Sequence, residues 1–298
     1  MKIAWSILGL ALVSLLNASA QVVTVQVSLE QEQFLPGESL PATVHIVNNS
    51  GQSLHLGAAP DWLTFSVESV DNDFVVMKND DPPVMDPFDL DSAEVATKRL
   101  DLAPFFAMTH AGRYRVVATV HIPEWGTDVR SPAQEFDIID GAQLWSQDFG
   151  VPVPAGVTNQ LPVVRKYILE EANYLRKQLR MYVLVSDQTG ARVLKVSAIG
   201  PMVSFSRPEA QLDRASSLHV LYQSGAQSFI YSVVNPDGNI TQQEIYDYLG
   251  TRPRLAVDDA GNIVVKGGVR RVKPGEVPAV TAPGEVPAPV PAPVPAQQ

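Results

Sequence analysis

The chain has 298 residues, no cysteine and a formal net charge of −10 at pH 7. Without cysteine it has no disulfide, thiol nucleophile or thiolate metal site. The negative charge disfavours nucleic acid and anionic lipid as partners, because both require a basic patch on the protein. The local basic runs, at residues 165–180 and 266–273, lack the glycine-rich loop of a phosphate site and are expected to be solvated surface.

The first twenty residues have the pattern of a cleaved export signal. Lys2 precedes an apolar run at residues 3–16, and Ala18-Ser19-Ala20 supplies the small residues that signal peptidase recognises. The run is too short for a transmembrane segment, and no later stretch reaches the roughly 18 apolar residues that a span requires. We therefore predict a signal peptide at residues 1–20. Because an exported chain without disulfides is typical of bacterial envelope proteins, we expect a periplasmic or extracellular location.

Residues 21–140 have the pattern of a β-sandwich. Apolar and polar side chains alternate from Val23 to Leu29, which places one apolar row on one face of a strand. Similar short runs, separated by turn residues, recur through this region. We predict strands at residues 23–29, 42–46, 62–67, 74–77, 98–102, 113–121 and 134–139. About seven short strands without an amphipathic helix indicate an antiparallel sandwich.

One local pattern in this region has the spacing of a tyrosine corner. The segment His110-x-Gly112-x-Tyr114-x-Val116 resembles that corner in immunoglobulin-like domains, where the tyrosine hydroxyl bonds to the backbone upstream. Antibody domains have cysteine at the position of Val116, and we expect Val44 to face it here, so aliphatic packing replaces the disulfide. The resemblance implies an immunoglobulin-like fold of the bacterial envelope type, and it implies no function.

An acidic loop lies within the same region. Residues 71–91 include seven aspartates and three prolines. Calcium binds six to eight oxygen ligands and is an alternative reading of such a loop. The spacing of an EF-hand is absent from the sequence, however, and the prolines favour an extended chain. We therefore expect a solvated loop.

Residues 141–272 contain a weak internal repeat. Segments 182–190 and 229–238 are each an apolar strand that closes on a polar turn with glycine. Pro208 and Pro253 stand 45 residues apart, and Gly200 and Gly250 stand 50 apart. This period, with about four strands per unit, resembles the blades of a β-propeller. Because a closed propeller needs at least about four blades, the resemblance implies a partial stack of β-meanders, or a repeat that another chain completes.

Two segments and the tail complete the predicted elements. Asp258-Asp-Ala-Gly-Asn262 has the residues of a tight hairpin turn, so its acids are expected to form the turn rather than bind a ligand. Residues 168–181 combine good helix formers with the pattern of a strand, and both alternatives remain. Residues 273–298 repeat Pro-Gly-Glu-Val-Pro-Ala, and we predict an extended or disordered proline-rich spacer.

Residues suited to chemistry are scattered along the chain. The sequence has no Gly-x-Ser-x-Gly elbow, His-Glu-x-x-His motif, phosphate loop or dinucleotide fingerprint. We expect no catalytic or metal role for its histidines, which are His45, His55, His110, His121 and His219. Six aromatic residues could form a sugar- or peptide-stacking face, although a place in the core is the expected one for Trp62, Trp125, Trp145, Tyr231, Tyr246 and Tyr248. We accordingly predict no catalytic, cofactor or metal residue.

These patterns predict an all-β protein, an immunoglobulin-like sandwich followed by a blade-like antiparallel β-domain. The predicted function is that of an exported cell-envelope binding or structural protein, an adhesion or scaffold module without catalytic activity. Its expected partner is an unknown envelope protein or glycan. The alternative is a carboxylate-dependent hydrolase of glycans or peptides, which would require two convergent carboxylates in a deep cleft.

Overall fold

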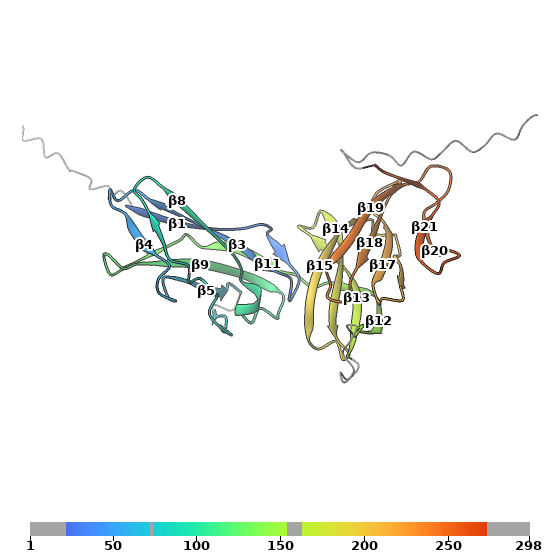
Figure 1. The fold of residues 1–298 in the computed structure, drawn as a ribbon, viewed down its shortest axis with the longest axis horizontal. Helices are drawn as coiled ribbons and strands as arrows, with labels where there is room; N and C mark the ends of the chain where they lie inside the picture. Colours follow the sequence, from blue (N-terminus) through green and yellow to red (C-terminus); the bar gives the residue numbers. More distant parts are fainter. Residues whose placement is uncertain (1–21, 72–73, 154–162, 273–298) are drawn as a thin grey trace, which may run out of the picture.

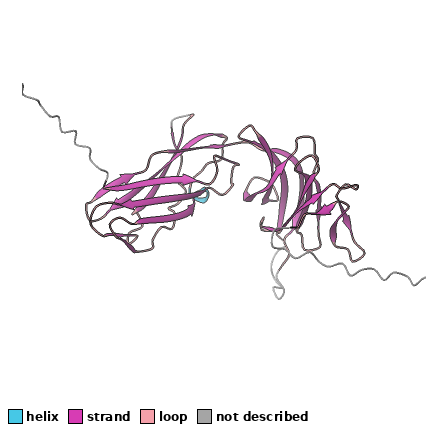
Figure 2. Ribbon diagram, turned by 90° about the horizontal axis from the view of Figure 1, so that it is seen from above, coloured by secondary structure: helices cyan, strands magenta, loops and turns pink. Residues whose placement is uncertain are grey.

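The computed structural model describes residues 22–71, 74–153 and 163–272. The predicted signal peptide and proline-rich tail lie outside the described residues. As predicted, the described chain is all-β: apart from one 3₁₀ turn at Ala103–Phe105, its regular elements are strands (Figure 2). The strands pair antiparallel, with one parallel exception between β2 (Gln33–Phe34) and β11 (Gln134–Ile138). No helix among the described residues has the length and apolar content to span a membrane.

Residues 22–140, here the N-terminal part, form two main sheets. The first has the strand order β1 (Val23–Leu29), β3 (Pro41–Asn48) and β8 (Val95–Asp101). The second has the order β2, β11, β9 (Gly112–Ile122), β5 (Leu63–Ser69) and β6 (Phe74–Val75), and β10 (Thr127–Arg130) pairs with β9. A separate pair joins β4 (Leu54–Leu56) and β7 (Phe88–Leu90). The seven predicted strands are present, and β2, β4, β7 and β10 are additional.

One apolar core joins the two sheets of the N-terminal part. Alternate residues of β3 and β9 are buried, which is the pattern of strands that bury one face. Val44 of β3 and Val116 of β9 are both 0% exposed and belong to the same core. The Tyr114 hydroxyl donates a hydrogen bond to the His110 carbonyl at 2.8 Å, so the predicted bond of the corner is confirmed. The wider likeness to immunoglobulin-like domains stays a prediction.

Residues 141–272, here the C-terminal part, form two antiparallel meanders and a hairpin. The first meander consists of β12 (Ala142–Gly150), β13 (Val164–Tyr174), β14 (Gln178–Asp187) and β15 (Val193–Met202). The second meander consists of β16 (Glu209–Leu212), β17 (Leu218–Gln223), β18 (Ser228–Val234) and β19 (Ile240–Asp247), and β22 (Val269–Arg270) extends it. The terminal hairpin consists of β20 (Arg254–Val257) and β21 (Ile263–Lys266).

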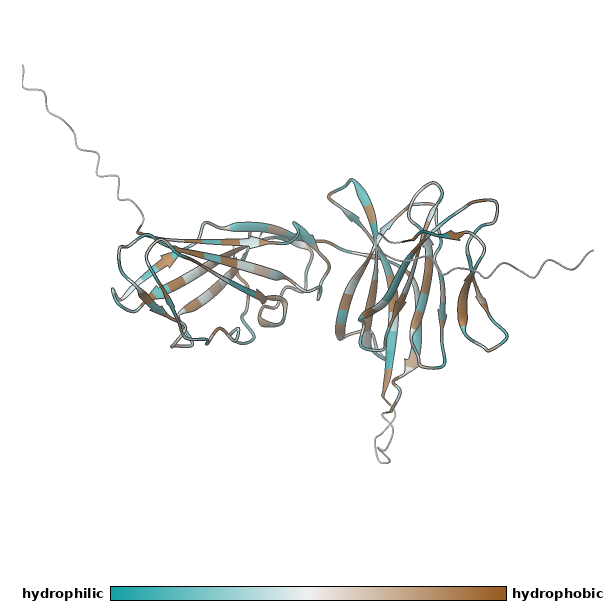
Figure 3. Cartoon of the chain, turned by 45° about the horizontal axis from the view of Figure 1, so that its top comes forward, coloured by the Kyte–Doolittle hydropathy of each residue, from teal (hydrophilic) through white to brown (hydrophobic). Residues whose placement is uncertain are grey.

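These three sheets are stacked face to face (Figure 1). One apolar layer, with Tyr167 and Val220, lies between the first and second meanders. A second layer, with Leu221, Leu255 and Ile263, lies between the second meander and the terminal hairpin. Both strands of the hairpin are strongly hydrophobic (Figure 3). The predicted stack of meanders is therefore the arrangement of the described residues, whereas the likeness to propeller blades stays a prediction.

The segment at residues 168–181, for which helix and strand remained alternatives, is two strands and a turn. Residues 168–174 belong to β13 and residues 178–181 to β14, and the two strands pair through Tyr174 and Gln178. The turn between them places Leu175 at φ 51° and Arg176 at φ 54°. Left-handed backbone at two successive positions is the geometry of a type I′ hairpin turn, which glycine and asparagine usually occupy.

The N-terminal part contacts the outer face of the first meander. Leu35, which is 1% exposed, inserts into an apolar cluster with Ile168, Tyr182 and Val196. The Leu35 backbone N–H donates to Glu38 at 2.8 Å, so the Glu38 carboxylate holds the turn that carries Leu35. Around this contact, polar groups also join the two parts: Arg180 donates to the Gln31 side chain at 2.9 Å, and the Leu175 N–H donates to the Gln33 side chain.

Candidate functional site

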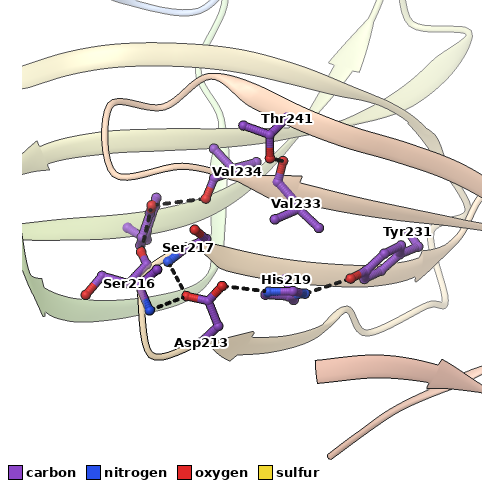
Figure 4. Close-up of polar contacts among 10 residues, drawn as sticks. Asp213, Ser216, Ser217, His219, Tyr231, Val233, Val234 and Thr241 are labelled. Atoms are coloured by element: carbon purple, nitrogen blue, oxygen red, sulfur yellow. Dashed lines mark hydrogen bonds and ion pairs between the residues drawn. The ribbon is translucent and has the colours of Figure 1, made fainter. Parts of the chain in front are cut away.

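A buried polar chain lies on the second meander, beside the terminal hairpin (Figure 4). The His219 imidazole of β17 lies between the Tyr231 hydroxyl, 2.7 Å from Nδ1, and the Asp213 carboxylate, 3.3 Å from Nε2. A carboxylate only accepts hydrogen bonds, so Nε2 of a neutral imidazole carries the proton and Nδ1 accepts from Tyr231. Carboxylate, imidazole and phenol in this order are the parts of an acid–base relay.

Burial assigns these groups a structural role. His219 and Tyr231 are 8% and 5% exposed, which leaves a substrate no access to them. Asp213 also caps the turn between β16 and β17, because its other oxygen accepts from the backbone N–H groups of Ala215 and Ser217 at 2.9 and 2.8 Å. Burial, with the charges of Glu244 and Asp213, raises the pKa of Tyr231 to about 12. The relay therefore fixes β17 and its turn.

The other histidines lie at the surface of the N-terminal part. His55 is 2.6 Å from Asp89 and His121 is 2.8 Å from Asp128. The hydrogen bond that His55 donates to Asp89, and then the charge of Asp89, raise the pKa of His55. His45 contacts Thr97 at 3.0 Å. Each of these histidines has a neighbour on the adjacent strand, so they read as exposed sheet residues.

The acidic loop spreads its carboxylates over different partners. Asp71 accepts from the Arg113 backbone N–H at 2.8 Å, and Asp89 contacts His55. Asp81 pairs with Lys78, and Asp86 pairs with Lys98 at 2.6 Å. Within the described ranges, three histidine, aspartate or glutamate side chains do not converge at any point. The loop is thus held by separate ion pairs and hydrogen bonds, and Asp73 lies outside the described residues.

Two of the six aromatic candidates, Trp62 and Tyr231, are buried, and three more are partly buried against the cores. Trp62 is 1% exposed and its indole N–H donates to the Val84 carbonyl at 2.9 Å. Trp125 and Trp145 pack against the cores of the two parts. Tyr231 and Tyr246 form an edge-to-face pair with centroids 6.4 Å apart, under the terminal hairpin. Tyr248, 43% exposed, is the one left at the surface, so these six residues form no stacking face.

A polar groove of about 770 Å³ lies between the N-terminal part and the first meander. It is lined by Asp71 and Asp137 together with Arg113 and Arg176. Both carboxylates already have partners: Asp71 holds the Arg113 backbone, and Asp137 binds the Arg113 guanidinium at 3.2 Å and the Gln33 amide at 3.2 Å. Both carboxylates of the groove thus already accept hydrogen bonds from Arg113.

The terminal hairpin has one open edge. β20 is closed on its outer side, where the Leu255 N–H donates to the Glu209 carboxylate at 2.8 Å. Leu255 lies opposite Val265, and because its N–H points away from β21, the two residues form a non-hydrogen-bonded pair. The N–H and C=O groups of Val265, and by alternation those of Ile263, therefore point outward from β21. In the part of the chain that the structure describes, no further strand pairs with this edge.

Sequence reasoning found neither the relay nor the open edge. His219 gave no signal, because its partners are six and twelve residues away and meet it only through the turn and the β17–β18 pairing. The open edge had a signal, since the repeat with a period of 45 residues matches β16–β17 to β20–β21 and then stops. It leaves β18 without a counterpart.

Comparison with known proteins adds a weak similarity to a solved structure. No protein-family model matches the chain, and no curated protein matches its sequence. Among solved structures, the chain is similar to Spo0M, a sporulation control protein from Bacillus subtilis, with 14% sequence identity and a TM-score of 0.31. The match covers 71% of this chain and 79% of that chain. A similarity of this size carries no inference about fold or function.

Proposed function

We propose that this is an exported cell-envelope protein that binds or scaffolds an envelope protein or glycan, without catalysis. The single observation that supports it most is the open edge of β21, which presents unpaired backbone groups along the terminal hairpin. An exposed strand edge is a template for pairing with another chain, and proteins that do not use one usually blunt it. The export pattern of residues 1–20 is the support for the location.

The alternative, a carboxylate-dependent hydrolase, has less support. Glycosidases need one carboxyl group that protonates the leaving group and one that attacks or activates water. The groove between the two parts contains Asp71 and Asp137. The Arg113 backbone N–H donates to Asp71, and the Arg113 guanidinium donates to Asp137. The buried Glu38 has a raised pKa, but its oxygens accept from the Leu35 backbone and the Gln31 amide.

Capture from an envelope extract tests this proposal. The mature chain, residues 21–298, is immobilised and incubated with solubilised envelope and with purified cell-wall glycan. We expect stoichiometric retention of one protein or glycan and no release of soluble fragments. Release of glycan or peptide fragments that is lost in Asp137→Asn would instead establish the hydrolase. Retention of nothing above an unrelated β-sandwich control would overturn the binding function.

A further inference from the structure

We propose that β21 is a strand-addition site whose occupant is an extended peptide segment of a partner polypeptide, running antiparallel to β21. This inference rests on the proposed binding function and names its mode. Three independent observations carry it: the direction of the backbone groups of β21, the strand that the same chain adds at the equivalent place, and the partly covered apolar layer beneath.

The first observation is the hydrogen-bonding direction of β21. The turn of the hairpin pairs the Asp258 N–H with the Asn262 carbonyl at 2.9 Å. Hydrogen-bonded and non-hydrogen-bonded pairs alternate along an antiparallel ladder, so Val264 bonds to β20. Ile263 and Val265 then direct their N–H and C=O groups away from β20. Two donors and two acceptors are thus aligned along one edge. An incoming strand that pairs with them satisfies these groups without any change in the hairpin.

The second observation is the internal match between the second meander and the terminal hairpin. With an offset of 45 residues, Leu218 corresponds to Ile263 and Val220 corresponds to Val265. Leu218 and Val220 lie opposite Val234 and Ser232 of β18, which is the next strand of that sheet. The side chains of Leu218 and Val220 face the first meander, and those of Ile263 and Val265 face the second meander in the same way. The chain itself therefore shows what pairs with such an edge: a seven-residue strand like β18, in which every residue except Ser228 and Ser232 is apolar or aromatic.

The third observation is the apolar layer under the edge. Leu221, Tyr231 and Val233 of the second meander are buried in it, but Tyr246 and Val265 are only partly covered. A strand added beside β21 extends the hairpin sheet toward the side of the layer where β18 and β19 lie. It therefore covers the part of the layer that contains Tyr246 of β19. The inward residues of the occupant therefore bury apolar surface as well as completing hydrogen bonds.

Two other occupants fit less well. The chain's own residues after 273 contain a proline in every five consecutive residues, and proline cannot donate to a strand ladder. If the β21 edge of a second copy paired here, the second meander of that copy would lie on the same side of the joined hairpins as the second meander of this chain. The two meanders would then compete for the same space. A flexible segment from another polypeptide meets neither obstacle.

The test uses a peptide whose pairing the chain already shows. The probe is a labelled peptide of residues 226–248, which contains β18 and β19, and the receptor is the full mature chain. We expect saturable binding by fluorescence anisotropy, and loss of binding when the peptide is N-methylated at Ser232 and Val234. Val265→Pro removes the free donor, and Val265→Ala is its control because it disrupts the side-chain packing of Val265 but keeps the N–H. We expect affinity for the proline variant to be at least about tenfold below that for the alanine variant.

A measurement on the unmodified chain guards against misfolding of the proline variant. In hydrogen exchange, the Ile263 and Val265 amides should exchange rapidly and become protected when the peptide is added. Equal affinity of the two variants, no gain of protection, or dimerisation of the chain through this edge in sedimentation would each overturn the proposal. Failure of the peptide alongside successful envelope capture would reject strand addition only, whereas failure of capture would reject the binding function itself.

Discussion

Two buried tyrosines show how the same side chain can stabilise or destabilise the fold. The Tyr114 hydroxyl donates to the His110 carbonyl at 2.8 Å, and its ring is 4% exposed. We expect Tyr114→Phe to lower the free energy of unfolding by about 0.5 to 1.5 kcal/mol, the usual net value of one hydrogen bond. Urea denaturation of the mature chain measures it. An unchanged denaturation midpoint would show that the hydrogen bond of the tyrosine corner does not stabilise the fold.

Tyr182 is the converse case. It is 0% exposed, and its hydroxyl makes no hydrogen bond of normal geometry among the described residues, with only a weak contact to the Arg180 guanidinium. Burial, followed by the charge of Glu38, raises its pKa to about 12. Because an unsatisfied buried hydroxyl is costly, we expect Tyr182→Phe to raise the free energy of unfolding by about 1 kcal/mol. Tyr114→Phe, measured under identical conditions, is the control of opposite sign. A destabilised Tyr182→Phe would show that the hydroxyl does have a partner.

Glu38 gives the fold a pH dependence. Burial raises its pKa above the ordinary 4.5, more than hydrogen bonds from Leu35 and Gln31 and the charge of Arg180 lower it. The folded state therefore binds this proton more tightly than the unfolded state, so the contribution of Glu38 to stability is largest below pH 4.5 and falls as the pH rises through the raised pKa.

The matched variant for this effect is Glu38→Gln, which cannot ionise. We expect its free energy of unfolding to increase relative to that of the unmodified chain as the pH is raised from acid to neutral. Urea denaturation across that range gives the difference at each pH. A constant difference, or one that shrinks with rising pH, would contradict the sign derived from burial.

At the scale of elements, three hairpins of the C-terminal part close with the same turn. Asp213, Asn235 and Asp258 each accept, through the side chain, from the backbone N–H groups two and four residues later. These bonds, chiefly the one from Asn262, lower the pKa of Asp258. The fourth residue of each turn is left-handed, and it is glycine in two of them. In the third it is Ser216, at φ 61°.

This difference predicts opposite effects of two substitutions. Ser216→Gly should raise the free energy of unfolding by about 0.5 kcal/mol, because relief of left-handed strain exceeds the entropy cost of glycine. Gly190, at φ 80° in the turn after β14, has no atom within 4 Å of an added Cβ. Gly190→Ser should therefore lower it by about 1 kcal/mol through backbone strain alone. Thermal melts of both variants check the pair, and effects of equal sign would refute the strain argument.

The same turns explain which elements could be predicted. Glycine marked the turns after Asp187, Asn235 and Asp258, and the strands that lead into the first two of these turns were predicted correctly. The turn at Asp213 has serine at the left-handed position, so β16 before it gave no signal. The β13–β14 turn places Leu175 and Arg176 in left-handed backbone, and this choice depends on a contact with Gln33 far away in the sequence. Local propensity could not separate helix from hairpin there.

For the molecule as a whole, the contact at Leu35 determines whether the two parts unfold together. The sequence predicted neither β2 nor the insertion of Leu35 into the first meander, because the partner residues are more than 130 positions away. We predict that residues 21–140 fold alone. The predicted boundary near Asp140 rests on this expectation, and the fragment needs a cooperative melt to support it.

One substitution in two contexts measures the coupling. In the full mature chain, Leu35→Ala should cost about 2 to 5 kcal/mol, as for other buried leucines. In the fragment 21–140, where Leu35 has lost the first meander, the same change should cost less than about 0.5 kcal/mol. Denaturation of the four proteins gives both values. Equal costs would mean that Leu35 serves the N-terminal core and does not join the two parts.

Because the C-terminal part is a stack of similar layers, its length can change by the addition of whole layers. Residues 209–253 form one layer, and the terminal hairpin begins the next with matching residues, 45 positions later. A duplicated copy of this segment therefore finds the same kind of surface on both sides. Since stacked sheets lie about 10 Å apart, each inserted layer moves the edge of β21 about 10 Å further from the N-terminal part. The stack is in this respect a molecular spacer with a fixed increment, which sets how far the edge of β21 lies from the N-terminal part.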